Sequence, residues 1–442
     1  MFLIKSQQSR ESRLAEGREC RKRLSRIDFG QVNPWKRNFD PMTVLRSAEK
    51  GRVRELLPLK YKRMSVSPFA FFRGSVGLMA ADLARLPSTG LTVQLCGDAH
   101  VQNLGSFSAP DGRTVFDIND FDETIPGPWE WDVKRIAASL ALAGTESGHG
   151  QPQCAAAVTQ FAISYCTLME ALAEEPVLAA ARHQIHRPRE AQAVSAALQQ
   201  AEQANPADLL RKYTELNSKK QVQFKSDGPG LRREVGSRRK QVLGAIPLYR
   251  KSLPPERLHL FDFFEPKDVC FKVVGTGSVG LRAYVVLMEG NGPGDPLFLQ
   301  IKQEVRSAYA PYLKAGICRH EGQRVVEGQR RIQPLSDLLL GWTRIADQDY
   351  LVRQLNDHKG SVDIGNLAGD GLRSLAEIAG ELLARGHARS GDALAIKGYV
   401  GAPHKIVKAI VQYGLDYAAL VHADFEKFQK LIAAGKIKTQ SV

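Results

Sequence analysis

One stretch of the chain, residues 268–304, has the pattern of three strands separated by two glycine-rich turns. FKVV precedes GTGSVG, and LRAYVVLM, the turn GNGPGDP and the apolar run LFLQIKQE follow it. β-branched and apolar runs divided by short turns favour antiparallel strands. Helical patterns occupy most of the remaining chain, so the sequence predicts an α+β fold with a small antiparallel sheet.

The first turn of this stretch matches the pattern G-x-G-x-x-G at Gly275, Gly277 and Gly280. This pattern is a weak signal alone, because several unrelated folds use it. In a dinucleotide-binding fold the last glycine opens a helix, whereas a strand pattern follows here. A glycine loop between antiparallel strands is the phosphate cover of kinase-type enzymes. We therefore predict that this loop, with Ser278, binds a nucleoside triphosphate; the alternative is a β-hairpin with three convenient glycines.

Lys302 lies in the apolar run after this loop. A lysine there is costly to desolvate unless its ammonium has an anionic partner, and a nucleotide phosphate is such a partner. The alternative is a strand-end lysine that reaches solvent. In kinases a glutamate on the next helix holds this lysine. The predicted helix 319–333 offers Glu321 and Glu327, and we favour Glu327 because it is mid-helix.

A second cluster of polar residues follows two short predicted strands. CGDAHVQNLG contains Asp98 and Asn103, and FDINDFDET contains Asp120. A site that phosphorylates a hydroxyl needs a carboxylate to orient or deprotonate the acceptor, and hard oxygen ligands for Mg²⁺. These residue types fit that chemistry. Taken singly, each is more typical of a turn or a helix cap.

GDAHVQN, NDFDE and the later WEWD resemble the catalytic core of the aminoglycoside and choline phosphotransferase branch of the protein-kinase-like superfamily. The resemblance implies that Asp98 is the catalytic base, that Asn103 and Asp120 bind Mg²⁺, and that Asp132 braces the catalytic loop. His100 matches a histidine common in that branch. Asp122 and Asp117 are close enough in sequence to share in metal binding.

Further motifs extend the resemblance over nearly the whole chain. SPFAFFRG, LCGDAHVQNLG, FDINDFDETIPGPWEWDVKR, KVVGTGSVG, GQRVVEGQR and LARGHARSGD are similar to the uncharacterised bacterial family called domain of unknown function 2252. That resemblance implies a kinase-like fold and leaves the substrate unnamed.

The order of the motifs departs from that of ordinary kinases, because Asp98 and Asp120 precede the glycine loop and Lys302. A circular permutation accommodates this order. We expect a basic N-terminal arm (1–66), a helical lobe with the catalytic and metal loops (67–255), a nucleotide-binding sheet lobe (256–358) with a hinge at 356–359, and C-terminal helices that complete the helical lobe (359–442). Lys302 and Asp120 are then predicted to meet across one cleft.

Basic residues outnumber acidic ones, 61 to 47. The excess is concentrated in residues 1–63 and 211–246, and residues 219–246 are predicted to form a loop. Such blocks usually form a solvated surface or a flexible arm; the sharper interpretation is attraction of a nucleic acid, an anionic membrane face or a phosphorylated substrate. Nucleic-acid binding rests on charge alone, because no aromatic stacking pattern accompanies it.

The sequence predicts a cytoplasmic protein without a membrane span. No window approaches the ~18 consecutive apolar residues that a span requires, and the apolar start is too short for a signal peptide. The six scattered cysteines favour reduced core thiols.

The predicted function is ATP- and Mg²⁺-dependent transfer of phosphate to a hydroxyl of a small molecule or, less favoured, a protein. The basic blocks and Arg73 in FFRG suit an anionic acceptor. The alternatives are nucleotidyl transfer from the same scaffold, and a non-catalytic protein that binds a nucleotide or polyanion.

Overall fold

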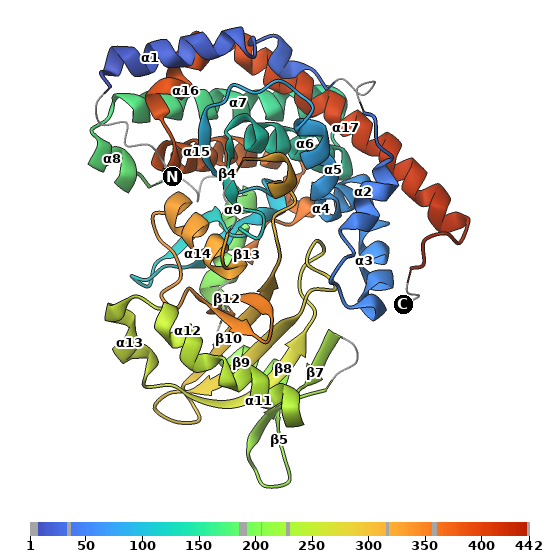
Figure 1. Cartoon of the computed structure of the whole chain (residues 1–442), viewed down its shortest axis with the longest axis vertical. Coiled ribbons are helices and arrows are strands. Elements are labelled where there is room, and N and C mark those ends of the chain that lie inside the picture. The colour runs from blue at the N-terminus through green and yellow to red at the C-terminus, as the bar shows by residue number, and fades with distance from the viewer. Residues whose placement is uncertain are drawn as a thin grey trace.

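The computed structural model describes residues 8–32, 37–184, 192–204, 206–226, 230–314, 318–355 and 360–439. It has the mixed α+β composition that the sequence predicts. Long helices gather at one end of the molecule and the largest sheet lies at the other (Figure 1).

The helices are α1 (Arg10–Glu19), α2 (Pro41–Ser47), α3 (Leu57–Met64), α4 (Pro68–Gly74), α5 (Val76–Leu83), α6 (Glu130–Glu146), α7 (Gln151–Glu174), α8 (Val177–Arg182), α9 (Gln192–Gln203), α10 (Pro206–Tyr213), α11 (Gly236–Gly244), α12 (Ile246–Ser252), α13 (Pro255–Phe261), α14 (Glu321–Ile332), α15 (Gly371–Ser390), α16 (Ala393–Val400) and α17 (Pro403–Ala433). The strands are β1 (Thr92–Leu95), β2 (Leu104–Ser108), β3 (Thr114–Ile118), β4 (Ile125–Pro128), β5 (Thr214–Leu216), β6 (Val222–Phe224), β7 (Leu231–Arg233), β8 (Glu265–Lys272), β9 (Ala283–Glu289), β10 (Pro296–Glu304), β11 (Gly341–Ile345), β12 (Gln348–Gln354) and β13 (Gly360–Ser361).

The largest sheet has six strands in the order β11-β12-β10-β9-β8-β7, and its neighbouring strands are antiparallel. The predicted strands of residues 268–304 are its centre, and the glycine loop joins β8 to β9. Val286, Leu299 and Ile301 belong to a buried cluster that includes Tyr249 of α12. This apolar packing fixes the face of β10 and therefore the side to which Lys302 points.

The prediction of a loop over residues 219–246 is wrong. These residues include β6, β7 and α11, and β7 extends the large sheet by pairing with β8. Buried Asp268 accepts hydrogen bonds from Phe224 N and Arg233 Nε, both at 2.8 Å. Tertiary contacts to one buried carboxylate thus order a segment whose own sequence is basic and polar. β7 therefore belongs to the large sheet by pairing with β8, and α12 packs against β11 of the same sheet. Both elements precede residue 256, where the sheet lobe is expected to begin.

The helical end is built around α6, α7, α15 and α17. The segment Ser67–Arg85 contains two helices, α4 and α5, because the backbone leaves the helical conformation at Ser75. Ser67 caps α4 by accepting a hydrogen bond from Ala70 N, and Pro68 follows it at the first helical position. α1, within the predicted basic arm, packs on α16, where Arg13 pairs with Asp392.

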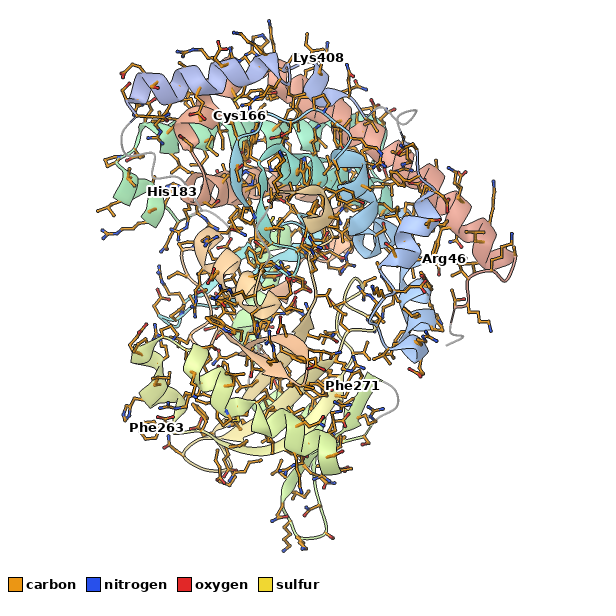
Figure 2. All side chains as sticks on the ribbon, viewed as in Figure 1. Arg46, Cys166, His183, Phe263, Phe271 and Lys408 are labelled. Carbon is orange, nitrogen blue, oxygen red and sulfur yellow. The ribbon has the colours of Figure 1, made fainter. Side chains whose placement is uncertain are left out.

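Among the described helices, α7 is long and apolar enough to cross a membrane. Half of its most apolar window is buried in the structure, and the helix packs against α15 and α17. This is the packing of a core helix. Buried Cys166 lies on α7, and Figure 2 shows it among the helices, whereas Phe271 of β8 lies in the sheet. Five cysteines are buried thiols as predicted, but Cys318 is exposed.

Two small sheets, β1-β4 and β13-β2-β3, lie between the α6 region and the large sheet and carry the polar motifs. The loop after β1 contains Asp98, and the loop between β3 and β4 contains Asp120 and Asp122. β2 and β4 escaped sequence prediction because they are short and glycine- or proline-containing. The predicted hinge, residues 356–359, lies outside the described residues.

Candidate functional site

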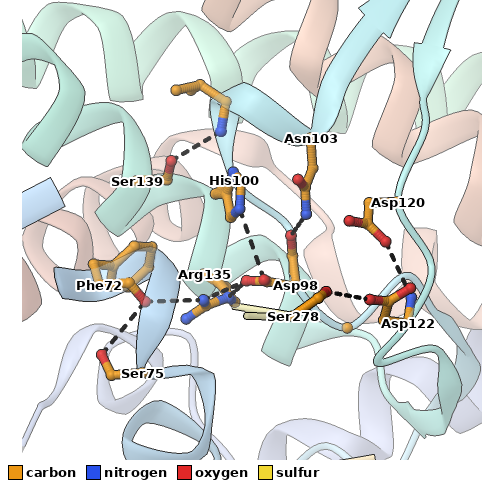
Figure 3. Close-up of polar contacts among 12 residues, drawn as sticks. Phe72, Ser75, Asp98, His100, Asn103, Asp120, Asp122, Arg135, Ser139 and Ser278 are labelled. Atoms are coloured by element: carbon orange, nitrogen blue, oxygen red, sulfur yellow. Dashed lines mark hydrogen bonds and ion pairs between the residues drawn. The ribbon is translucent and has the colours of Figure 1, made fainter. Parts of the chain in front are cut away.

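Three segments meet at one place in the structure. They are the glycine loop Gly275–Gly280, strand β10 with Lys302, and the loop between β3 and β4 with Asp120 and Asp122, here called the acidic loop. Lys302 Nζ lies 3.8 Å from Asp120 Oδ1 and forms an ion pair with Asp122. Ser278 Oγ donates a hydrogen bond to the same Asp122 carboxylate at 3.0 Å (Figure 3). Groups 156 and 180 positions apart in the sequence are therefore in contact.

Lys302 is buried, with a relative exposure of 3%. Burial alone lowers the pKa of this ammonium, but Asp120 and Asp122 outweigh burial and raise the pKa above its usual value. Burial raises the pKa of Asp122, but Lys302 more than offsets this and the pKa falls to about 2. Both groups are therefore charged at neutral pH, and the strand-end alternative for Lys302 is wrong.

Asp132 of α6 binds the backbone of the loop that carries Asp98. The Asp132 carboxylate accepts hydrogen bonds from Cys96 N at 2.8 Å and from Gly97 N at 3.1 Å. His387, near the end of α15, places Nε2 3.4 Å from the same carboxylate. The bracing contact implied for Asp132 by the resemblance is thus present in the geometry.

The Asp98 side chain faces a cavity with one oxygen engaged. Arg135 Nε of α6 donates to Asp98 Oδ1 at 2.7 Å, and the guanidinium lies over the Phe72 ring. Burial raises the pKa of Asp98, and Arg135 only partly opposes that rise. His100 Nε2 lies 3.7 Å from Asp98 Oδ2, and burial holds the pKa of this imidazole well below its usual value. His100 is therefore neutral, and its Nδ1 has no hydrogen-bond partner in the described part of the chain.

Asn103 contacts Asp98, and Asp120, which lies next to Asp122 (Figure 3), lines the same cavity as Asp98. Asn103 Nδ2 donates to the Asp98 backbone carbonyl at 2.8 Å, and the Asp120 side chain is 34% exposed. Within the described part of the chain, no group of three or more His, Cys, Asp or Glu side chains is placed to hold a metal ion. Mg²⁺ commonly binds one or two carboxylates together with phosphate oxygens and water, so this arrangement fits Mg²⁺ brought with a phosphate ligand.

Asp117 does not join this group. Its carboxylate forms a buried ion pair with Arg385 of α15. Alternation along β3 turns Asp117 away from the loop that follows the strand.

Glu327 does not reach Lys302, which corrects the expectation from sequence. Glu327 is about half exposed; it accepts a hydrogen bond from Gln323 and lies 3.6 Å from Arg331, while Glu321 pairs with Arg324. The buried side of α14 carries Val325, Val326, Gly328, Gln329 and Ile332, so Glu327 falls on the opposite side. Asp122 takes the place expected for a helix glutamate.

Two arginines that the sequence analysis missed hold the site together. Arg324 of α14 donates to the Asp122 carbonyl at 2.8 Å and the Val305 carbonyl at 2.9 Å, which ties the acidic loop to the end of β10. Arg52 donates to the Gly277 carbonyl at 2.7 Å and to the Val279 carbonyl. No sequence pattern marks either contact, because both donors bind backbone carbonyls of distant segments.

The glycine loop has the conformation that its glycines permit. Gly275 and Gly280 have φ of +65° and +91°, which residues with a side chain rarely adopt. Two neighbouring cavities share Asp120, Gly275 and Ser278 as lining residues. The first, about 210 Å³, lies against Lys302 and Arg353; the second, about 610 Å³, lies against Asp98 and Asn103.

The fold and the site define an α+β protein in which loops of the large sheet and of the helical part surround shared cavities. Residues 52–431 match the family model of uncharacterised proteins conserved in bacteria, DUF2252, and the chain belongs to this family. No curated protein and no solved structure gave a significant match.

Proposed function

We propose that this chain is an ATP- and Mg²⁺-dependent phosphotransferase with a circularly permuted, protein-kinase-like architecture. The observation that carries the proposal is the meeting of buried Lys302 with Asp120 and Asp122 beneath the glycine loop. A buried ammonium, a glycine loop and carboxylates around one cavity are the groups that bind a nucleoside triphosphate with its metal.

The order of the elements supports the permutation. Starting at β8, the chain passes through the glycine loop, β9, Lys302 on β10, α14, β11 and β12, and then α15. Near the end of α15, His387 Nε2 lies 3.4 Å from Asp132 of α6, the carboxylate that braces the Asp98 loop. With the chain read from β8 and continued at its N-terminal part, the motifs follow the kinase order.

The residues have distinct proposed roles. Lys302 and the backbone N–H groups of Gly275–Gly280 bind the phosphates, and Asn103 and Asp120, with Asp122, would hold Mg²⁺. The metal would neutralise phosphate charge during transfer. Asp98 Oδ2, the oxygen that Arg135 does not engage, orients the acceptor hydroxyl and takes its proton; the acceptor oxygen bonds to the γ-phosphorus, the bond from that phosphorus to its bridging oxygen breaks, and ADP leaves.

Calorimetric titration with Mg-ATP tests the nucleotide site. We expect Lys302→Met and Asp120→Asn each to weaken binding about tenfold or more, because each removes a charge that holds the phosphates or their metal. Glu327→Gln, exposed on α14, is the control and should bind within about twofold of the native chain. Equal affinities in all four proteins would overturn the site.

Turnover is tested by ATP consumption against a library of hydroxyl compounds. Asp98→Ala should bind Mg-ATP normally and lose turnover, because Asp98 serves the acceptor. Product mass distinguishes a gain of phosphate from a gain of AMP. A gain of AMP, or full turnover in Asp98→Ala, would contradict phosphoryl transfer by these residues.

A further inference from the structure

The larger cavity has a wall of cationic side chains that the proposed nucleotide site does not use. Lys60 of α3, Arg73 of α4 and Arg52 line it together with Asp98 and residues of the glycine loop. All three belong to the segment before β1, whereas Lys302 comes from the large sheet.

Lys60 is a buried lysine without a counterion among the described residues. Its relative exposure is 1%, and among the described residues it has no hydrogen-bond or ion-pair partner. The charged groups that face it are Arg52, Glu49 and Glu123. Glu49 accepts a hydrogen bond from Tyr61, and Glu123 accepts one from Ala308 N at 2.6 Å, so both carboxylates have other donors. Burial, reinforced by Arg52, lowers the pKa of Lys60 to about 7.

Arg73 is the second unsatisfied cation. Its Nε is buried without a hydrogen-bond partner among the residues that the structure describes, and its guanidinium lies 5.9 Å from the centroid of the Phe69 ring. The acidic side chains that interact most strongly with the Arg73 guanidinium are Asp98 and Asp120. Asp98 is already engaged by Arg135.

The remaining acids of the cavity do not balance these cations. Asp120 and Asp122 both lie within ion-pair distance of Lys302, and burial raises the pKa of Glu304 well above its usual value, which favours the neutral carboxyl. Arg52 is bound by neutral carbonyls of the glycine loop. A buried charge is costly without a partner, so the wall at Lys60 and Arg73 is suited to an anion.

We infer that the larger cavity binds the phosphate group of an anionic acceptor, a small alcohol that is also a phosphate monoester, through Lys60 and Arg73. This inference rests on the proposed function for the role of acceptor, although the anion site stands on its own contacts. A phosphate monoester carries nearly two negative charges at neutral pH, which matches the guanidinium of Arg73 and the ammonium form of Lys60 that a bound anion favours. Its hydroxyl would lie toward Asp98, which lines the same cavity.

Binding of inorganic phosphate, followed by calorimetry at pH 6.5, tests the anion site. We expect Lys60→Met and Arg73→Gln each to weaken phosphate binding about tenfold or more, since each removes a charge-assisted hydrogen bond. Lys267→Met, which removes an exposed ion pair with Glu265 on β8, is the control and should stay within about threefold of the native chain. Lys60→Met replaces a buried ammonium by an apolar side chain of similar length, so it should fold.

Three results would overturn the inference. These are no phosphate binding to the native chain, unchanged binding in both Lys60→Met and Arg73→Gln, or acetate binding as tightly as phosphate. Mg-ATP titration of Lys60→Met separates the two proposals: ATP affinity near that of the native chain with lost phosphate affinity supports an acceptor site. Phosphate binding that depends on Lys60 and Arg73, in a chain that binds no ATP, would overturn the proposed function and leave the anion site intact.

Discussion

At the scale of single residues, the charge pair of Lys302 and Asp122 is the feature on which the site depends. Both side chains are largely buried, and removal of one partner leaves an unpaired charge. Lys302→Met should therefore lower the free energy of unfolding by about 3 kcal/mol. The double variant with Asp122→Asn should be less destabilised than the sum of the single variants, as measured by urea denaturation.

The control for this cycle is Lys267→Met. Lys267 pairs with Glu265 on the same sheet, but Glu265 is 74% exposed. An exposed pair contributes at most about 1 kcal/mol. If Lys302→Met lowered the free energy of unfolding as little as Lys267→Met, the Lys302 pair would make no special contribution to stability.

The burial of Lys60 leads to a separate prediction about how stability depends on pH. Its pKa is about 7 in the folded chain and has an unperturbed value of 10.5, so the unfolded chain binds more protons between these values. Stability from Lys60 therefore rises with pH from about 7 to 10.5, with a slope of at most about 1.4 kcal/mol per pH unit. Denaturation at several pH values should show this slope in the native chain and a smaller one in Lys60→Met. Identical slopes would contradict a buried, unpaired Lys60.

The residues of the site divide into those that sequence can predict and those that it cannot. Asp98, Asn103 and Asp120 stand in compact motifs with chemically meaningful spacing, and the structure brings them together with Lys302. Arg135 and Arg324 have no such signal, because their partners are remote in the chain. Glu327 was a wrong prediction since the helical periodicity of α14, and not its central position, decides which side faces the site.

At the scale of elements, the loop after β1 depends on a glycine at a position where a side chain would be strained. Gly97 has φ of +90°, and an added Cβ would lie 2.3 Å from the Glu123 carbonyl oxygen. Gly97→Ala should lower the free energy of unfolding by more than about 2 kcal/mol and weaken turnover, since the Asp98 loop must shift.

Gly112→Ala is the matched control. Gly112 also has a positive φ, +79°, but nothing lies within 4 Å of an added Cβ. Gly112→Ala should lower the free energy of unfolding by about 1 kcal/mol, because only the strain of the positive φ remains. Thermal or urea denaturation of the two variants compares them directly, and equal costs would mean that the close approach to Glu123 does not constrain the loop.

Elements with strong periodicity were predictable, and short ones were not. Apolar runs at β8, β9 and β10 and the helical pattern of α6 have enough residues to define a period. β7 has three residues, and β2 and β4 contain glycine or proline. These strands form because a partner strand satisfies their backbone, which local sequence does not record.

At the scale of the whole molecule, segments from both halves of the chain come together in the proposed site. The loops after β1 and β3 carry the carboxylates, whereas the middle of the chain carries the glycine loop and Lys302. Contacts such as that of Ser278 with Asp122 join these parts, and they depend on tertiary packing that no single motif encodes.

The most direct test of this account is a crystal structure of the chain with Mg²⁺ and a non-hydrolysable ATP analogue. The account predicts phosphates between Gly275–Gly280 and Asp120, with Lys302 Nζ bonded to a phosphate oxygen and Mg²⁺ on Asp120. A nucleotide bound elsewhere, or phosphates without contact to Lys302 and Asp120, would contradict it.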